Sequence, residues 1–176
     1  MLQKLTTIAT VCLAAVAAGS NPTNEIIADT DPYTKYDSLH PIPALDIRMN
    51  PLPEVGIYTR NKKLTLVTNV ASFWGLTPSH YTWMTELYTK YSEYGFEILA
   101  FPCNQFANQE PYDDAWIENF ARTKYGAKYP MFNKIDVNGD NAHDVFRFLR
   151  RHSSLYDNST GTVGEISWNF GKFLVG

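Results

Sequence analysis

The sequence predicts an α/β domain in which a central sheet is flanked by helices. Two short apolar runs, residues 64–71 and 96–101, are typical of buried strands, and a helical pattern lies between them. Further helical and extended patterns alternate after the second run. A strand–helix–strand unit places its two strands parallel in one sheet, with a right-handed crossover. A chain of 176 residues is long enough to bury one such core.

The first helix is predicted from its two ends and from the spacing of its apolar residues. Thr77 supplies an expected N-cap, Pro78 fits the first helical position, and Gly95 ends the pattern. The apolar and aromatic residues that recur at helical spacing are Tyr81, Met84, Leu87, Tyr88, Tyr91 and Tyr94.

The later elements follow the same alternation. We expect a helix over about 113–125, an extended segment over 129–137, a third helix over about 142–151 and a last strand over about 170–175. The residues expected to face inward on the second of these helices are Trp116, Ile117, Phe120 and Ala121. The elements therefore predict one domain, with residues 20–56, rich in Pro, Asn and Asp, as an extended lead-in.

The N-terminus has the features of a secretory signal peptide. A short positive start precedes an apolar run, residues 5–18, that ends in small residues and is too short to span a bilayer. We predict that residues 1–19 are removed and that the protein is secreted; the alternative is an N-terminal anchor or a helix of the fold. Cys12 would leave with the signal, so Cys103 would be the single thiol of the mature chain. Asn158-Ser159-Thr160 is a glycosylation sequon, which agrees with export.

Charge and side-chain spacing exclude several classes of function. Fifteen basic and eighteen acidic residues give a net charge of −3, which offers no basic surface for nucleic acid and no polybasic membrane patch. The four histidines lack the spacing of metal ligands, and a calcium loop over 136–147 fails because Asn141 and Arg147 stand where Gly and Glu are required. We expect no metal, no cofactor and no stable membrane insertion.

Four sequence blocks, in this order, resemble the glutathione peroxidases: NVASFWGLTPSHY, FPCNQFANQEP, KIDVNGDNAH and WNFGKFLVG. The resemblance runs from about residue 64 to the last residue. It implies a thioredoxin-like fold with a central mixed β-sheet flanked by helices. Members of the family continue past FLVG with another strand and a C-terminal helix. The glutathione-peroxidase-like domain, residues 57–176, is therefore expected to lack its C-terminal strand and helix.

The resemblance also implies an activity, the reduction of hydroperoxides by thiols. By the family's motifs, the site residues are Trp74 at the nucleophile position, Gln105, Trp168 and Asn169. Glutathione or another thiol would be the reducing co-substrate. Short stretches between the blocks resemble the compact, monomeric members, whose open site would admit lipid hydroperoxides as well as hydrogen peroxide.

Trp74 stands where active members carry selenocysteine or cysteine. A nucleophile in a turn before a helix faces the positive end of the helix dipole, which lowers the pKa of a thiol or selenol and favours the attacking anion. An indole has no ionisable nucleophile. Two interpretations remain open: a selenocysteine codon, UGA, has been written as tryptophan, or the chain is a catalytically inactive homologue that acts as a binding protein.

Two other positions bear on the mechanism. Family members that use an internal disulfide carry a resolving cysteine in the second helix, and the matching position here is Arg122. Any activity would therefore depend on external thiols. A lone cysteine beside a strand is more often a small buried hydrophobe, so we expect Cys103 to be structural and not the nucleophile.

Overall fold

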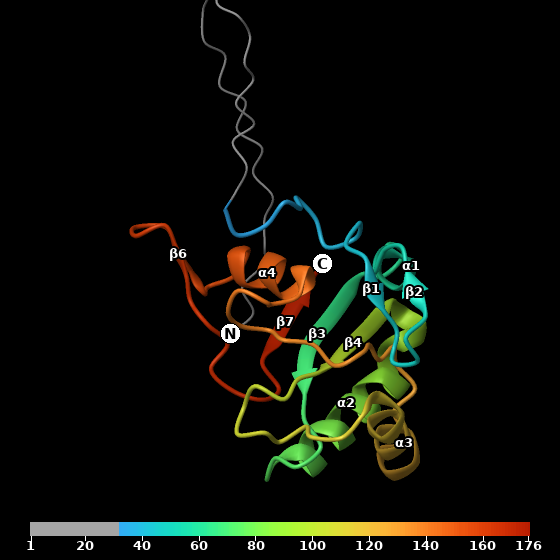
Figure 1. Ribbon diagram of the computed structural model, residues 1–176. Helices are drawn as coiled ribbons and strands as arrows, with labels where there is room; N and C mark the ends of the chain where they lie inside the picture. Colours follow the sequence, from blue (N-terminus) through green and yellow to red (C-terminus); the bar gives the residue numbers. More distant parts are fainter. Residues whose placement is uncertain (1–31) are drawn as a thin grey trace, which may run out of the picture.

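The structure is a computed structural model that describes residues 32–176, and its centre is a three-stranded sheet in the order β4–β3–β7 (Figure 1). Strands β3 (Leu64–Val70) and β4 (Phe96–Pro102) are parallel, as the strand–helix–strand pattern predicts. Strand β7 (Lys172–Val175) pairs with β3 in the antiparallel direction. The sheet is therefore mixed.

A segment on the other side of β4 widens the sheet. Ala100 forms a parallel bridge with Met131, and its amide and carbonyl groups bond the backbone of Pro130 and Phe132 at 3.1 and 3.0 Å. Phe132 in turn forms an antiparallel bridge with Asp46. The extended segment predicted after the second helix thus pairs with β4 and joins the N-terminal region to the sheet.

Helices α2 (Thr77–Tyr91) and α3 (Asp114–Tyr125) cover one face of the sheet. A short 3-10 helix, η1 (Ser92–Tyr94), follows α2, and Gly95 ends it with a left-handed φ of 95°. The buried residues that fill this layer include Leu66, Val70, Ile98 and Ala100 from the strands and Tyr81, Met84, Ile117 and Ala121 from the helices. Of the residues predicted to face inward on α3, Ile117 and Ala121 are buried and the two aromatic rings are partly buried.

Helix α4 (Asp144–Arg151) covers the opposite face, as Figure 1 shows. Its N-cap is His143, whose ring nitrogen accepts a hydrogen bond from the Val145 amide. The buried residues of this second layer include Val67, Leu99 and Phe101 from the strands and Val145, Phe146 and Leu149 from the helix. Successive strand residues point to opposite faces, so β3 and β4 supply both layers, and their nearly continuous apolar sequence follows from this.

The region predicted to be an extended lead-in contains regular structure. Strands β1 (Ala44–Leu45) and β2 (Pro51–Leu52) form a hairpin, and helix α1 (Gly56–Thr59) follows it. Ile42, Ile47 and Val55 are buried there. These three apolar residues are not periodic, so the sequence predicts no helix or strand there. In the structure they pack into the core beside the sheet. The signal peptide predicted over residues 1–19 lies outside the described residues.

A second hairpin, β5 (Tyr156–Asp157) and β6 (Thr162–Val163), carries the glycosylation sequon. Asn158, Ser159 and Thr160 form its exposed connection. Within residues 32–176, no helix is both long enough and apolar enough to cross a membrane.

Candidate active site

The candidate site begins at the turn that follows β3. The Trp74 carbonyl accepts a hydrogen bond from the Thr77 amide at 3.0 Å, so residue 74 directly precedes the first turn of α2. Leu76, not Thr77, occupies the N-cap position, and the Thr77 hydroxyl instead donates to the Ala71 carbonyl at 2.6 Å. The Thr77 side chain therefore links the start of α2 to the residue that follows β3. The predicted placement of residue 74 beside a helix N-terminus is observed.

The indole of Trp74 packs against two other rings. Its centroid lies 5.1 Å from that of His80 and 5.6 Å from that of Phe170, with the ring planes within 27° of parallel. His80 and Phe170 also stack on each other at 4.8 Å. Burial and the nearby charge of Lys172 lower the pKa of His80. In this chain position 74, the predicted nucleophile position, is thus filled by a ring that belongs to an aromatic cluster.

Asn69, in β3, anchors the loop that contains the WNF motif. Its side-chain amide donates to the Trp168 carbonyl at 3.2 Å and accepts from the Gly171 amide at 2.8 Å. The Phe170 amide donates to the Asn69 backbone carbonyl at 2.9 Å. A Cβ at Gly171 would lie 3.1 Å from the Asn69 amide oxygen and 2.9 Å from Ile166, so the loop approaches β3 too closely for a larger residue. Asn69, the first residue of the NVAS motif, therefore positions the distant WNF loop.

Asn169 is brought to the turn by a glutamine of the FPCNQFANQEP block. Its side-chain nitrogen donates to the Gln109 amide oxygen at 2.7 Å. The Gln109 carbonyl accepts a hydrogen bond from the Phe73 amide at 3.0 Å, one residue before Trp74. Asn169 is 5% exposed, and its neighbour Trp168 is 43% exposed, with its ring 5.9 Å from that of Phe106. Gln109, Asn169 and the turn are thus linked directly.

Gln105, the glutamine assigned by the family resemblance, is committed elsewhere. Its amide oxygen accepts from the backbone amides of Val137 and Asn138 at 2.8 and 3.0 Å, and its nitrogen donates to the Asn138 carbonyl at 3.0 Å. Gln105 therefore holds the 137–138 loop, and Gln109 bonds Asn169 instead. The two glutamines lie four residues apart in one motif, so spacing alone does not separate them. The conformation of the loop gives them different partners.

Glu110 is a further residue at this turn, and sequence reasoning missed it. It is 0% exposed, and its carboxylate accepts a hydrogen bond from the Ser72 amide at 2.7 Å. Burial raises the pKa of the Glu110 carboxyl to about 7. The sequence signal that could have found it is a charged residue directly after the site glutamine, in a loop that follows a parallel strand.

Cys103 is buried and remains a thiol. Burial raises the pKa of Cys103 to about 11, and its sulfur lies 3.6 Å from the Gln105 amide oxygen. A thiol with this pKa carries almost no thiolate at neutral pH, and the thiolate is the nucleophile. The structure thus agrees with a packing role for Cys103.

Arg122, at the position of a resolving cysteine, has a structural role. Its guanidinium donates to the carbonyls of Ala127 and Tyr129 at 2.7 and 2.8 Å. It also lies 3.8 Å from Glu118 one turn earlier on α3. This side chain closes the connection between α3 and the segment that pairs with β4.

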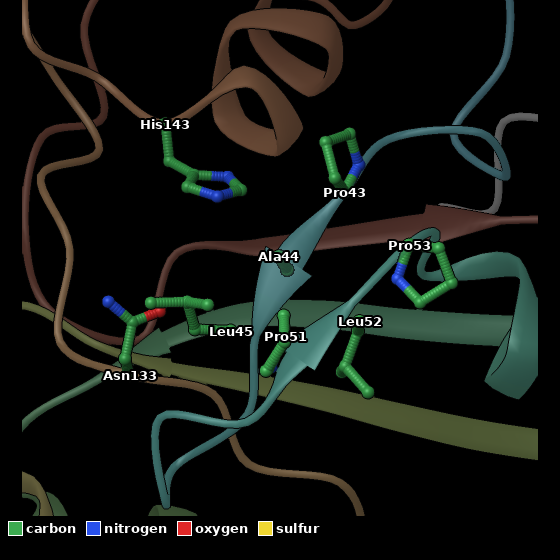
Figure 2. A pocket seen from close by; sticks show the side chains of 8 residues that line it. All are labelled: Pro43, Ala44, Leu45, Pro51, Leu52, Pro53, Asn133 and His143. Atoms are coloured by element: carbon green, nitrogen blue, oxygen red, sulfur yellow. The ribbon is translucent and has the colours of Figure 1, made fainter.

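The two cavities described for this structure lie beside other residues. The larger, of about 660 Å³, is lined by Pro43, Ala44, Leu45, Pro51, Leu52, Pro53, Asn133 and His143. Figure 2 shows these side chains around the β1–β2 hairpin. A second cavity of about 380 Å³ includes Gln105 and Phe106 in its lining. Neither of these two cavities includes Trp74, Gln109 or Asn169 in its lining.

Comparisons with known proteins relate this chain to one family. The family "Glutathione peroxidase" matches residues 47–150. The chain is 44% identical over 157 residues to an Arabidopsis thaliana protein, "Probable phospholipid hydroperoxide glutathione peroxidase 6, mitochondrial", covering 89% of this chain and 62% of that one. It is 45% identical over 143 residues to a Nicotiana tabacum "Probable phospholipid hydroperoxide glutathione peroxidase", covering 81% and 79%. The crystal structure of Trgpx in apo form matches with a TM-score of 0.55 at 28% identity, covering 80% of this chain and 79% of that chain.

The fold and the strand-end site define the class: a thioredoxin-like α/β protein with a mixed sheet flanked by helices. The chain belongs to the glutathione peroxidase family. It is thus a member of a family of peroxidases, and it spans about 62% of the length of the Arabidopsis relative.

Proposed function

We propose that this protein is a thiol-dependent hydroperoxide reductase in which residue 74 of the natural protein is a selenocysteine. The observation that carries the proposal is the 2.7 Å hydrogen bond from Asn169 to Gln109 beside the turn of residue 74, in a chain of this family. Side-chain amides next to a helix N-terminus are suited to stabilise an anion. An indole forms no such anion, so these amides would have no anion to stabilise at Trp74.

The proposed reaction has two halves. The selenolate at residue 74 attacks a peroxide oxygen, the Se–O bond forms as the O–O bond breaks, and the leaving alkoxide takes a proton and departs as an alcohol. A first external thiol then reduces the selenenic acid, releasing water and leaving a selenenyl sulfide, and a second thiol restores the selenol and leaves as a disulfide. Gln109 and Asn169 would supply N–H donors to the anions. The chain needs external thiols because Arg122 stands at the resolving position.

The substrates and location are part of the same proposal. The Nicotiana and Arabidopsis relatives are both named as phospholipid hydroperoxide peroxidases, which supports lipid hydroperoxides alongside hydrogen peroxide. Glutathione or a similar small thiol is the proposed reductant. We propose a secreted monomer, on the basis of the apolar N-terminal run and the compact spacing between the motifs.

The alternative is an inactive homologue that binds a ligand or partner. Its support is the packing of Trp74 itself, whose ring is accommodated between His80 and Phe170. A tryptophan that fits its surroundings is compatible with a genuine UGG codon. Reading codon 74 in the messenger RNA separates the two: UGG contradicts selenocysteine, and UGA supports it. Mass spectrometry of the native protein gives an independent answer, because selenium has a distinctive isotope pattern.

The site itself is tested by Trp74→Cys. We expect this variant to reduce hydrogen peroxide with glutathione at least about 100-fold faster than the Trp74 protein, since it restores a nucleophile to a prepared site. A coupled assay of disulfide formation measures it, with Trp74→Ser as the matched control. If Trp74→Cys turns over no faster than Trp74→Ser, the peroxidase proposal fails.

A further inference from the structure

The Gln109–Glu110 dipeptide bonds both the turn after β3 and Asn169. The consecutive amides of Ser72 and Phe73 both donate to it, at 2.7 Å to the Glu110 carboxylate and 3.0 Å to the Gln109 carbonyl. The Gln109 side chain accepts from Asn169. One dipeptide thus joins the turn after β3 to the WNF loop. Of the three hydrogen bonds just given, two reach the turn, and the one to Glu110 is made by a side chain.

The position of Glu110 is itself held from two sides. Its amide donates to the Asn104 side chain at 2.8 Å, and its carbonyl accepts from the Lys134 ammonium at 3.2 Å. Lys134 also donates to the Tyr112 carbonyl at 2.7 Å. The lysine therefore fixes the backbone around Glu110 and forms no ion pair with its carboxylate in the described structure. A buried carboxylate that accepts one hydrogen bond from a backbone amide is costly to the folded state.

We propose that Glu110 is a positioning residue for the nucleophile position: its carboxylate holds residues 72–74 in register with the Gln109–Asn169 amide pair. This meaning for catalysis rests on the proposed function, whereas the structural part stands on the hydrogen bonds of this chain. The second carboxylate oxygen and the Ser72 hydroxyl are both buried with no hydrogen-bond partner in residues 32–176. The hydrogen bond from the Ser72 amide to the Glu110 carboxylate is the contact that carries the effect.

The groups that face Glu110 come from each neighbouring element. Lys134 lies on the segment beside β4, Asp114 on α3, Tyr81 on α2 and Cys103 at the end of β4. The charge of Lys134 lowers the pKa of Glu110 and that of Asp114 raises it, but burial is the largest effect and brings it to about 7. The carboxylate therefore changes charge near neutral pH, and the strength of its bond to the turn changes with it.

The structural part is tested in the chain with Trp74 by amide hydrogen exchange of Ser72, followed by NMR. Glu110→Ala should speed exchange at Ser72 by about 10-fold, the effect of losing one hydrogen bond, because no other acceptor within residues 32–176 is bonded to that amide. Glu110→Gln should stay within about 3-fold, since the amide oxygen can still accept. Glu86→Gln, an exposed glutamate on α2, is the matched control and should change nothing. Unchanged protection at Ser72 in Glu110→Ala overturns the proposal.

A second measurement needs no substitution and so does not depend on the variants folding. The carboxyl carbon of Glu110 and the amide proton of Ser72 are followed through a pH titration of the unaltered protein. We expect the two shifts to move with one midpoint near pH 7. A Ser72 amide that is insensitive to the ionisation of Glu110 contradicts the positioning role.

The catalytic part is tested in the Trp74→Cys background. Alkylation of the thiol introduced at position 74 is measured against pH, where Glu110→Gln should lower the apparent thiol pKa because it removes a negative charge beside the turn. Glu110→Ala should lower kcat with little change in KM for the hydroperoxide, and Glu110→Gln should recover most of it. If Trp74→Cys is inactive with Glu110 intact, the proposed function fails while the exchange and titration results still decide the inference. If kcat is equal with Glu, Gln and Ala at 110, the inference fails and the function stands.

Discussion

At the residue scale, the site depends on which of two glutamines faces Asn169. Gln105 and Gln109 lie in one loop, and between them Ala107 and Asn108 both have left-handed φ angles, 52° and 53°. Two successive residues in this conformation reverse the chain locally. Gln105 is thereby directed to the 137–138 backbone and Gln109 to Asn169. The sequence motif does not predict this reversal of the chain.

The two glutamines should separate in a pair of variants made in the Trp74→Cys background. Gln109→Ala is expected to lower kcat/KM by about 100-fold, as for loss of one donor to a developing anion. Gln105→Ala should leave kcat/KM within about 3-fold and instead lower the free energy of unfolding by about 1–2 kcal/mol, because two backbone amides lose their acceptor. Steady-state kinetics and urea unfolding measure these effects. The opposite pattern would restore Gln105 as the site residue.

Glu110 should make stability depend on pH near neutrality. Burial raises its pKa from 4.5 to about 7, so the folded state favours the protonated carboxyl. This contribution to stability is fully present below pH 4.5 and is lost as pH rises through 7. Relative to Glu110→Gln, the unsubstituted protein should therefore lose roughly 2 kcal/mol between pH 5 and pH 8. Urea unfolding at both values measures the difference, and a constant difference would show that Glu110 does not titrate as described.

At the scale of elements, side-chain hydrogen bonds link the C-terminal end of α3 to the segment that pairs with the sheet. Gly126 ends the helix in a left-handed conformation, with a φ of 66°, and Arg122 then bonds the Ala127 and Tyr129 carbonyls. Tyr129 is buried and leads into the segment that bridges β4 at Ala100. Arg122 is thus a link between a helix and a strand in this chain.

Arg122→Met tests that link. The methionine keeps an apolar stem of similar length but leaves two carbonyls without their donor, so we expect the free energy of unfolding to fall by about 1–3 kcal/mol. Lys128→Met, an exposed residue in the same connection, is the control and should change stability by less than about 0.5 kcal/mol. Thermal and urea unfolding provide the measurement. Equal effects from both variants would mean that the Arg122 bonds contribute nothing.

At the scale of the whole molecule, two hairpins extend the α/β core. The β1–β2 hairpin joins the sheet layer through the Asp46–Phe132 bridge and borders the larger cavity (Figure 2). The β5–β6 hairpin projects from the region after α4 and places its connecting residues in solvent. The sequon at this tip is therefore accessible in the folded protein.

If the proposed secretion is correct, Asn158 should carry an N-glycan. The full chain expressed through the secretory pathway of a eukaryotic cell should run at higher mass than after glycosidase treatment, because Asn158 and Thr160 are both exposed. Asn158→Gln should abolish the shift, and Asn24→Gln, outside any sequon, should leave it unchanged. Secreted protein without a glycan would show that the sequon is unused, and protein that stays inside the cell would contradict secretion.

The sequence alone determined the strand–helix–strand unit and the family, because buried strands and amphipathic helices leave periodic patterns and the motif blocks are long. It placed Trp74 before α2, and it predicted a site role for Asn169, whose side chain bonds Gln109. Tertiary structure alone decided that Asn69 anchors the WNF loop, that Gln109 and not Gln105 meets Asn169, and that Glu110 is bonded to Ser72. These contacts join residues up to 102 positions apart and depend on how irregular loops turn. A loop's direction comes from backbone angles and packing, which no local periodicity encodes.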